Sequence, residues 1–268
     1  MTTTPARASR FDGAGQNRSL ERGLEILRAF RPGTDLLGNG ELVERTGLSP
    51  ATISRLTQTL VAGGFLEHDR RARAYRLAAP VLSLGHAMRA ASPVLHTAMP
   101  LMHEASARLK VNVGLASPDR LDMIYLDSIR YHRKASLRTV VAGQRVPIEL
   151  TSLGRAYLAT LLPPARQVLL DALRASHRPA AWRAISRDIR QAVADVAQSD
   201  YCAASWQPNV VALATPVATE GGPLALNFSL PVEDAATQRA SIAAGLAPAL
   251  LRLKESIVRA LAARTESR

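Results

Sequence analysis

The stretch Glu41–Leu60, ELVERTGLSPATISRLTQTL, decides the fold of the N-terminal part of the chain. A short helix ends at Gly47, because glycine favours the left-handed conformation of a helix terminus. Ser49 then caps a second helix that has Pro50 at its first position. The apolar residues of this second helix recur at helical spacing at Ile53, Leu56 and Leu60. The segment therefore predicts a helix, a tight turn and a second helix.

The outer face of the second helix is short and polar, which suits the major groove of DNA. Small residues permit close approach, and Arg55 and Gln58 are long enough to reach base edges. The free backbone N–H groups at the helix N-terminus can meet a phosphate. The candidate DNA-contacting residues are Ser49, Thr52, Ser54, Arg55, Thr57 and Gln58. An ordinary helical hairpin with a polar outside is the alternative that this pattern leaves open.

A β-hairpin is predicted directly after this helix, with strands over 65–69 and 74–77. Arg70, Arg71 and Arg73 crowd its tip, and Arg76 follows in the return strand. Arginines in this place can reach backbone phosphates or a narrow minor groove, so the first three are candidate DNA contacts. A solvated charge cluster explains the charge, but not its position after a helix-turn-helix.

The flanking segments complete a predicted domain order. Residues 1–16 form a polar, basic arm that we expect to be disordered, and residues 17–79 form a winged helix-turn-helix domain. Residues 80–92 contain a linker helix that Ser92-Pro93 terminates. Residues 93–268 form a second domain in which strands come in pairs with helices between and after them. This order predicts an α+β fold with an antiparallel sheet.

The second domain has these predicted elements. The strands are expected over 111–117, 122–128, 136–141, 210–217 and 224–230, with a turn at 118–120. The helices are expected over about 94–109, 151–161, 163–176, 182–198 and 233–263.

Composition narrows the class of protein. The chain of 268 residues carries a formal net charge of +12, which suits a polyanion such as DNA, although arginine-rich composition alone gives the same excess. Its one cysteine, Cys202, excludes disulfides and CxxC metal sites within the chain and fits a reducing cytoplasm. Neither a signal-peptide core nor an apolar run of about 20 residues is present, so we expect a cytoplasmic protein that does not enter the membrane.

Catalytic motifs are missing from the sequence. It contains no G-x-S-x-G elbow, Walker loop, HExxH pair or Rossmann fingerprint. Its six histidines are scattered without metal-ligand spacing. We therefore expect no catalytic residues, no metal and no cofactor, and conclude that the chain is not an enzyme.

Five segments resemble the IclR family of bacterial transcriptional regulators, and their order covers nearly the whole chain. They are Arg18–Leu27 (RSLERGLEIL), Thr46–Leu56 (TGLSPATISRL), Ala74–Leu77 (AYRL), Gly143–Pro147 (GQRVP) and Thr151–Ala156 (TSLGRA). The resemblance implies a winged helix-turn-helix, a linker helix and a GAF-like α/β effector domain. It also implies a homodimer or homotetramer that binds a palindromic operator on double-stranded DNA.

The resemblance further implies a pocket for a small, often carboxylate-bearing metabolite. Its first wall, carried over to matching positions, is Thr151, Ser152, Leu153 and Gly154. A helix N-terminus offers N–H donors and positive potential to an anion, which makes this assignment chemically sensible. A routine helix cap is the equally open alternative.

The second wall of the implied pocket comes from the last two strands, at Ala212, Asn227 and Ser229. Asn227 and Ser229 alternate on one strand and therefore share a face. Asn227 stands where the family commonly has serine, and inside an apolar strand it needs a partner, which a ligand or a backbone group can supply. This departure leaves the identity of the effector open.

Two neighbouring segments bear on the same pocket. Within Asp200–Pro208 the family's acidic pair is missing, and Trp206 and Gln207 stand there instead, which predicts a less acidic and more aromatic pocket unless Trp206 is a core or interface residue. Cys202 is expected to be a small buried hydrophobe. Arg130 or Arg133 can neutralise an anionic effector, with a solvated loop as the alternative.

The sequence thus predicts a DNA-binding transcriptional regulator that is modulated by a small-molecule effector. A nonspecific architectural DNA binder would not need the long segment after the linker. Whether the protein represses or activates, and which effector it binds, stay open.

Overall fold

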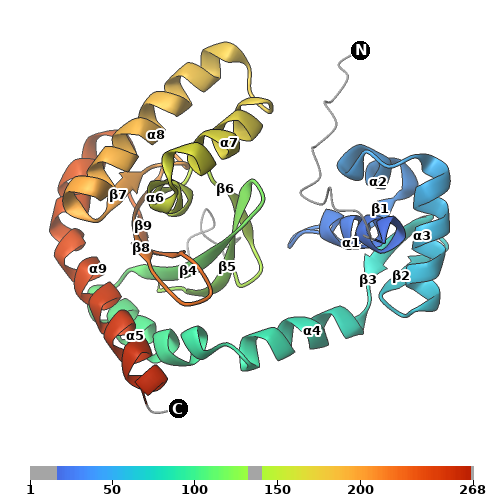
Figure 1. The fold of residues 1–268 in the computed structure, drawn as a ribbon, viewed down its shortest axis with the longest axis horizontal. Helices are drawn as coiled ribbons and strands as arrows, with labels where there is room; N and C mark the ends of the chain where they lie inside the picture. The colour runs from blue at the N-terminus through green and yellow to red at the C-terminus, as the bar shows by residue number, and fades with distance from the viewer. Residues whose placement is uncertain (1–16, 132–140, 267–268) are drawn as a thin grey trace. The chain divides into compact units, whose positions relative to one another are not determined.

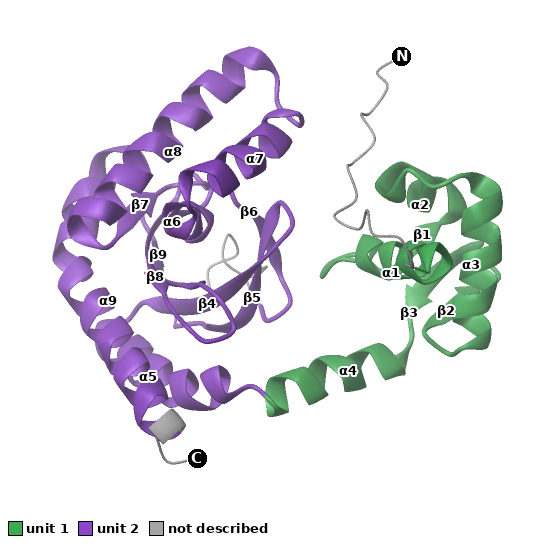
Figure 2. Ribbon diagram, in the orientation of Figure 1, with its two compact units in different colours: residues 1–91 green, residues 92–268 purple. Residues whose placement is uncertain are grey.

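The computed structural model describes residues 17–131 and 141–266 and divides into two compact units, residues 1–91 and 92–268 (Figures 1 and 2). The predicted basic arm over 1–16 lies outside the described residues. So does the predicted strand over 136–141, apart from Val141, which is in no strand.

The first unit is a winged helix-turn-helix followed by a helix. Its elements are α1 (Arg18–Ala29), β1 (Leu37–Gly38), α2 (Asn39–Thr46), α3 (Pro50–Ala62), β2 (Leu66–Asp69), β3 (Ala74–Leu77) and α4 (Ala79–Ala90). The three strands form an antiparallel sheet in the order β1-β3-β2. The sequence predicted the two helices of the helix-turn-helix, the hairpin and the linker helix, whereas β1 is two residues long and shows no alternation of its own.

Capping fixes the ends of the helices in this unit. Asn17 Oδ1 accepts hydrogen bonds from the backbone N–H groups of Ser19 and Leu20 at the start of α1. Gly47 has φ 71° at the end of α2, which is the left-handed conformation expected from the sequence. The three helices and the sheet then bury one apolar cluster made of Ile26, Ala29, Phe30, Leu37, Leu42, Ile53, Leu56 and Leu66.

The second unit is built on a six-stranded sheet in the order β6-β5-β4-β9-β8-β7, in which every neighbouring pair is antiparallel. Its strands are β4 (Asn112–Asp119), β5 (Asp122–Ile129), β6 (Arg145–Pro147), β7 (Cys202–Ala204), β8 (Val210–Val217) and β9 (Leu224–Pro231). Its helices are α5 (Pro93–Leu109), α6 (Ser152–Thr160), α7 (Pro163–Arg174), α8 (Pro179–Ser199) and α9 (Ala235–Glu266).

Helices cover both faces of this sheet (Figure 1). On one face, α5 and α9 bury Met102, Leu250 and Ile257 against strand residues such as Leu115 and Phe228. On the other face, a second apolar cluster joins α6, α7 and α8 to the sheet. The predicted α+β class and the antiparallel sheet are therefore confirmed.

The structure corrects several element boundaries. The turn expected at 118–120 is shorter, because Pro118 and Asp119 continue β4 and only Arg120, with φ 58°, takes the left-handed conformation that reverses the chain. The short strand β6 was not predicted, and no bounds were predicted for the three-residue β7. Both are edge strands fixed by pairing with a longer neighbour, so their own sequence carries little signal.

Candidate nucleic-acid interface and effector pocket

The exposed face of α3 carries most of the residues that the sequence assigned to DNA. Ser49, Arg55 and Gln58 are exposed, and Thr52 and Ser54 are partly buried. Ser49 Oγ accepts from the backbone N–H of Thr52 and lies 2.9 Å from Thr52 Oγ1, so this cap also orients the first turn of the helix. Arg55 and Gln58 are three residues apart and therefore lie on one face.

The assignment of Thr57 to the DNA-facing surface is wrong. Its side chain is 0% exposed, and its hydroxyl donates back to the carbonyl of Ile53 at 2.8 Å. Thr57 stands four residues after Ile53, so it falls on the buried stripe of α3. That spacing could have placed it in the core from the sequence.

The wing presents three of its arginines to solvent. Arg70, Arg71 and Arg73 are all exposed at the tip of the β2–β3 hairpin. Asp69 Oδ1 accepts from the backbone N–H groups of Arg71 and Ala72, which builds the turn that displays them. These two hydrogen bonds hold the pKa of the Asp69 carboxyl below its usual value, that of Ala72 most, with a further contribution from the charge of Arg76.

Arg76 differs from the other wing arginines because it is engaged inside the hairpin. Its Nη2 lies 2.7 Å from Asp69 Oδ2, and its Nε lies 4.0 Å from Glu67 Oε2. Arg76 therefore stabilises the hairpin, and the tip arginines are the ones left to contact a polyanion.

A small pocket lies between the start of α6 and the sheet, and it encloses about 60 Å³. It brings together six of the eight residues that the sequence assigned to the effector. These six come from separate segments, and the first and last of them, Thr151 and Ser229, are 78 residues apart. Those six are Thr151, Ser152, Leu153, Ala212, Asn227 and Ser229. The pocket is also lined by Tyr125, Val146, Ala204, Trp206, Gln207 and Val210.

The N-terminus of α6 forms the donor end of the pocket. Thr151 Oγ1 accepts from the Gly154 N–H, and the Thr151 carbonyl accepts from the Arg155 N–H. The helix offers no carbonyl to the N–H groups of Ser152 and Leu153, because the first turn of an α-helix lacks intrahelical acceptors. Ser152 and Leu153 are both buried and line the pocket.

Tyr125 and Asn227 form the inner wall of the pocket. Burial raises the pKa of the Tyr125 hydroxyl far above its usual value, and a hydrogen bond from Asn227 offsets this only in part, so the phenol stays neutral. Asn227 is 3% exposed, and its Oδ1 accepts no hydrogen bond from the residues described. An unpaired buried acceptor is costly, so this atom indicates a missing donor.

Gly114 explains how the inner wall can form. It pairs with Asn227 in the sheet, and a Cβ built on it would lie 2.4 Å from Tyr125 Cε1 and 2.6 Å from Asn227 Oδ1. The missing side chain lets Tyr125 cross β4 from β5 toward Asn227 on β9. Tyr125 is a pocket residue that sequence reasoning missed, because nothing local marks a strand residue that lies over a glycine on its neighbour.

Two predicted effector residues do not line the pocket. Gly154 is packed under the preceding loop, since a Cβ there would lie 2.1 Å from the Ile148 carbonyl oxygen, and its role is close approach. Arg130 follows the end of β5 and is not among the residues that line the pocket, and Arg133 lies outside the described residues.

The interpretation of Trp206 as a core residue is also wrong, because Trp206 is 46% exposed and borders the pocket with Gln207. Cys202 is buried, as expected.

The described part of the chain offers neither a candidate metal site nor a helix able to span a membrane. Among residues 17–131 and 141–266, no cluster of three His, Cys, Asp or Glu side chains is placed to hold a metal ion. In the same ranges no helix combines the length and apolarity needed to cross a membrane.

Comparison with known families gives two matches that together span most of the chain. Residues 19–70 match the IclR helix-turn-helix domain, and residues 86–257 match the C-terminal domain of bacterial transcriptional regulators of the IclR type. These families are transcriptional regulators, in agreement with the conclusion that the chain is not an enzyme.

Relatives of known sequence or structure agree with these matches. The HTH-type transcriptional regulator TsaQ1/TsaQ2 of Comamonas testosteroni is 39% identical over 163 residues, which cover 60% of this chain and 58% of that protein. A crystal structure of an IclR family transcriptional regulator from Brucella abortus is 32% identical, covers 96% of this chain and 97% of that one, and superposes with a TM-score of 0.83.

A second structure shares the fold and contains a ligand. An IclR homolog from Microbacterium hydrocarbonoxydans, complexed with 4-hydroxybenzoate, is 23% identical, covers 91% of this chain and 99% of that one, and has a TM-score of 0.65. The matched family models, the ordered motifs and the two-unit architecture agree. The chain belongs to the IclR family of bacterial transcriptional regulators.

Proposed function

We propose that the protein binds a specific operator on double-stranded DNA and that a small carboxylate-bearing metabolite in the pocket beside α6 changes this binding. The observation that carries the effector half is that Ser152 and Leu153, in the first turn of α6, line the same pocket as Asn227, whose buried Oδ1 is unpaired. The DNA half rests on the exposed polar face of α3 beside the arginine-rich wing.

In this proposal, α3 lies in the major groove and reads base edges. Arg55 can donate two hydrogen bonds to guanine, and Gln58 can pair with adenine. The cap residue Ser49 and the free N–H groups at the start of α3 contact a phosphate. Arg70, Arg71 and Arg73 on the wing neutralise further phosphates, which adds affinity but little sequence information.

The effector pocket has two chemically different ends. The positive end of the α6 dipole and the N–H groups of Ser152 and Leu153 fit a carboxylate. The unpaired acceptor of Asn227 and the neutral phenol of Tyr125 fit a group that both donates and accepts, which a hydroxyl does. We therefore propose a hydroxy acid as the effector, and 4-hydroxybenzoate in the Microbacterium homolog is one compound of this class.

The volume of the pocket limits how such an effector binds. The enclosed 60 Å³ equals the space of about two water molecules. A ligand of more than a few heavy atoms therefore needs a lining side chain to move, and Trp206 is the candidate because it is 46% exposed. We propose that effector binding moves the segment that carries Trp206 and Gln207.

Regulation requires that the effector bind two conformations of the protein with different affinity, since a ligand with equal affinity shifts nothing. By linkage, an effector that weakens operator binding must itself bind more weakly to the operator-bound protein.

We also propose that the protein works as a homodimer or homotetramer on a palindromic operator, which matches two recognition helices to two half-sites.

The test of the DNA half is selection of bound fragments from random and genomic DNA by the purified full chain at near-physiological salt. We expect a palindromic consensus whose half-sites are spaced by whole turns of the DNA helix. Enrichment without a consensus would leave only charge-driven binding and would contradict sequence-specific regulation.

The effector half is tested on the selected operator. Small hydroxy acids are added to the complex of a Trp182→Phe variant, in which Trp206 is the one remaining tryptophan, and operator affinity and tryptophan fluorescence are followed together. We expect a hydroxy acid to change both signals, and the matching acid without the hydroxyl to change them much less. Equal responses to both acids would contradict the role of Asn227 and leave the carboxylate assignment intact.

A further inference from the structure

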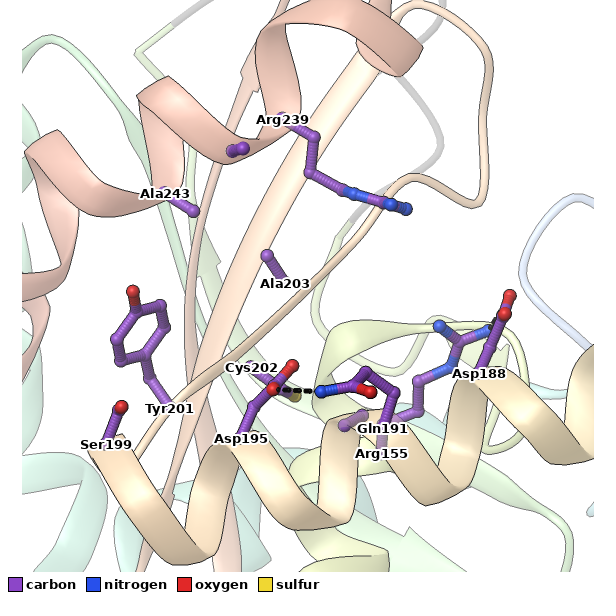
Figure 3. Close-up of a pocket in the computed structure, with 12 residues that line it drawn as sticks. Arg155, Asp188, Gln191, Asp195, Ser199, Tyr201, Cys202, Ala203, Arg239 and Ala243 are labelled. Carbon is purple, nitrogen blue, oxygen red and sulfur yellow. Dashed lines mark hydrogen bonds and ion pairs between the residues drawn. The ribbon is translucent and has the colours of Figure 1, made fainter.

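A second and larger cleft, separate from the effector pocket, lies between α8 and α9 and over the edge strand β7 (Figure 3). It encloses about 350 Å³, several times the volume of the effector pocket. Its lining includes Arg155, Asp188, Asp195, Tyr201, Arg239 and Ala243. None of these residues borders the pocket beside α6.

The floor of this cleft holds a buried guanidinium whose counter-ion is poorly placed. Arg155 is 7% exposed, and its Nε donates to the Glu149 carbonyl at 3.0 Å. Its Nη2 lies 3.5 Å from Asp188 Oδ2, which is long for a charge-assisted hydrogen bond, and the Asp188 side chain is half exposed. Burial lowers the pKa of Arg155, the direction expected of a charge removed from water.

A second guanidinium approaches the cleft from the opposite wall. Arg239 extends from α9 toward the region of Arg155 and Asp188 (Figure 3). It makes no hydrogen bond or ion pair with any residue in the described ranges. Its charge lowers the pKa of Arg155 further, so the two arginines act on each other across the cleft.

The carboxylates of the cleft do not neutralise Arg239. Asp195 Oδ1 accepts from Gln191 Nε2 at 2.8 Å on the same helix, and Asp188 is the partner of Arg155. The rest of the wall between α8 and α9 is the Tyr201 ring and alanines such as Ala203 and Ala243, which suit an apolar ligand body. One negative group between the two arginines is what this arrangement lacks.

We propose that this cleft is a second small-molecule site, which binds an anionic metabolite with its carboxylate or phosphate between Arg155 and Arg239. The two sites share a wall. Ser152 at the effector pocket and Arg155 in the cleft stand three residues apart on α6, and the Cys202 thiol, which lines the cleft, donates to the Ser152 carbonyl. An anion held here therefore lies against the helix that carries the effector donors.

The first test uses a matched pair of variants on α9. Arg239→Gln removes the exposed charge from the cleft, and Arg252→Gln removes an exposed charge from the same helix outside the cleft. Inorganic phosphate and benzoate are titrated separately into the full chain and followed by calorimetry. We expect Arg239→Gln to weaken the preferred probe roughly tenfold, the size of one charge-assisted hydrogen bond, and Arg252→Gln to match the unmodified protein.

The second test adds a charge in place of removing one. Ala240→Glu puts a carboxylate into the cleft, whereas Ala244→Glu puts the same charge at an exposed position of α9 outside it. Loss of binding in Ala240→Glu alone supports the site, and the stronger probe tells phosphate from carboxylate chemistry. No binding of either probe, or equal binding by both members of each pair, overturns the proposal without touching the effector pocket.

Discussion

The DNA-facing surface and the effector pocket are built in opposite ways. The surface is one face of a single helix with the adjoining hairpin, and its polar side chains are exposed and supported by local hydrogen bonds such as Ser49 to Thr52. The pocket collects buried groups from β5, α6, β8 and β9. A surface of the first kind tolerates substitution without loss of fold, whereas a pocket of the second kind couples its chemistry to its packing.

The largest effect that this comparison predicts comes from Gly154. Gly154→Ala places a Cβ 2.1 Å from the Ile148 carbonyl oxygen, and backbone cannot yield as a flexible side chain does. We expect a loss of roughly 1–3 kcal/mol or more of unfolding free energy, measured by thermal denaturation of the full chain.

The matched control is Gly245→Ala on α9, where a new Cβ meets nothing within 4 Å. This variant should be stabilised by roughly 0.5–1 kcal/mol, because alanine is the better helix former. If Gly154→Ala unfolds like Gly245→Ala, α6 is not held against the loop as described.

The next prediction tests the exposed DNA-facing surface of α3. Arg55→Ala should leave thermal stability unchanged and weaken specific operator binding by roughly 1–3 kcal/mol, with relaxed base preference at one position. Binding is measured on the selected operator and on single-base variants of it.

Arg71→Ala on the wing tip is the control for Arg55→Ala. It should weaken binding to all sequences alike and reduce the salt dependence, since Arg71 is proposed to contact only phosphate. Uniform weakening by Arg55→Ala as well would show that Arg55 reads no base.

A smaller effect is expected in the effector pocket, where a substitution of Asn227 should change ligand affinity and leave folding stability nearly unchanged. Asn227→Leu removes the unpaired buried acceptor together with the hydrogen bond to Tyr125, so the two effects oppose each other and the unfolding free energy should change little. Affinity for a hydroxy acid effector should fall by about 1–3 kcal/mol, as expected when a buried donor loses its partner, and affinity for the matching deoxy acid should not. A parallel fall in stability would mean that Asn227 is a structural residue.

The smallest effect is a pH dependence confined to the wing. The folded-state pKa of Asp69 lies below its ordinary value of 3.8, so its carboxylate stabilises the folded hairpin above that pH and loses this contribution as the pH falls through the folded pKa. Asp69→Asn should therefore lower stability near neutral pH and make the acid-side decline shallower, while Asp234, whose pKa is also lowered, keeps its own contribution. The two proteins are compared by thermal denaturation at several pH values, and parallel curves would contradict the assignment.

Much of the first unit follows from its sequence because its signals are local. Ser49 as a cap, Gly47 at a left-handed helix end, and the buried Ile53 and Leu56 are all fixed by neighbours within one or two helical turns. Thr57 was misplaced although its spacing from Ile53 carried the answer, because its polar hydroxyl outweighed its position in the pattern.

The pocket could be predicted only in part. Six of its residues were placed by motif resemblance, which assigns positions but not contacts. Gly154 was assigned to the ligand because the motif includes it, whereas the structure uses it for close packing against Ile148. Tyr125 carries no local mark of a pocket residue, since its place depends on a strand far away in the chain, and for Trp206 the motif position left the pocket and the core or an interface as alternatives.

The sequence by itself therefore determined the helix-turn-helix, the wing, the antiparallel class of the second domain and the family, because caps, turns and periodicity act over a few residues. Only the tertiary structure decided that Tyr125 crosses Gly114 to reach Asn227, and that Arg155 and Arg239 converge on one cleft. Gly114 and Tyr125 are 11 positions apart in the sequence, and Gly114 and Asn227 are 113 positions apart. Long-range packing, which no local pattern encodes, brings them together.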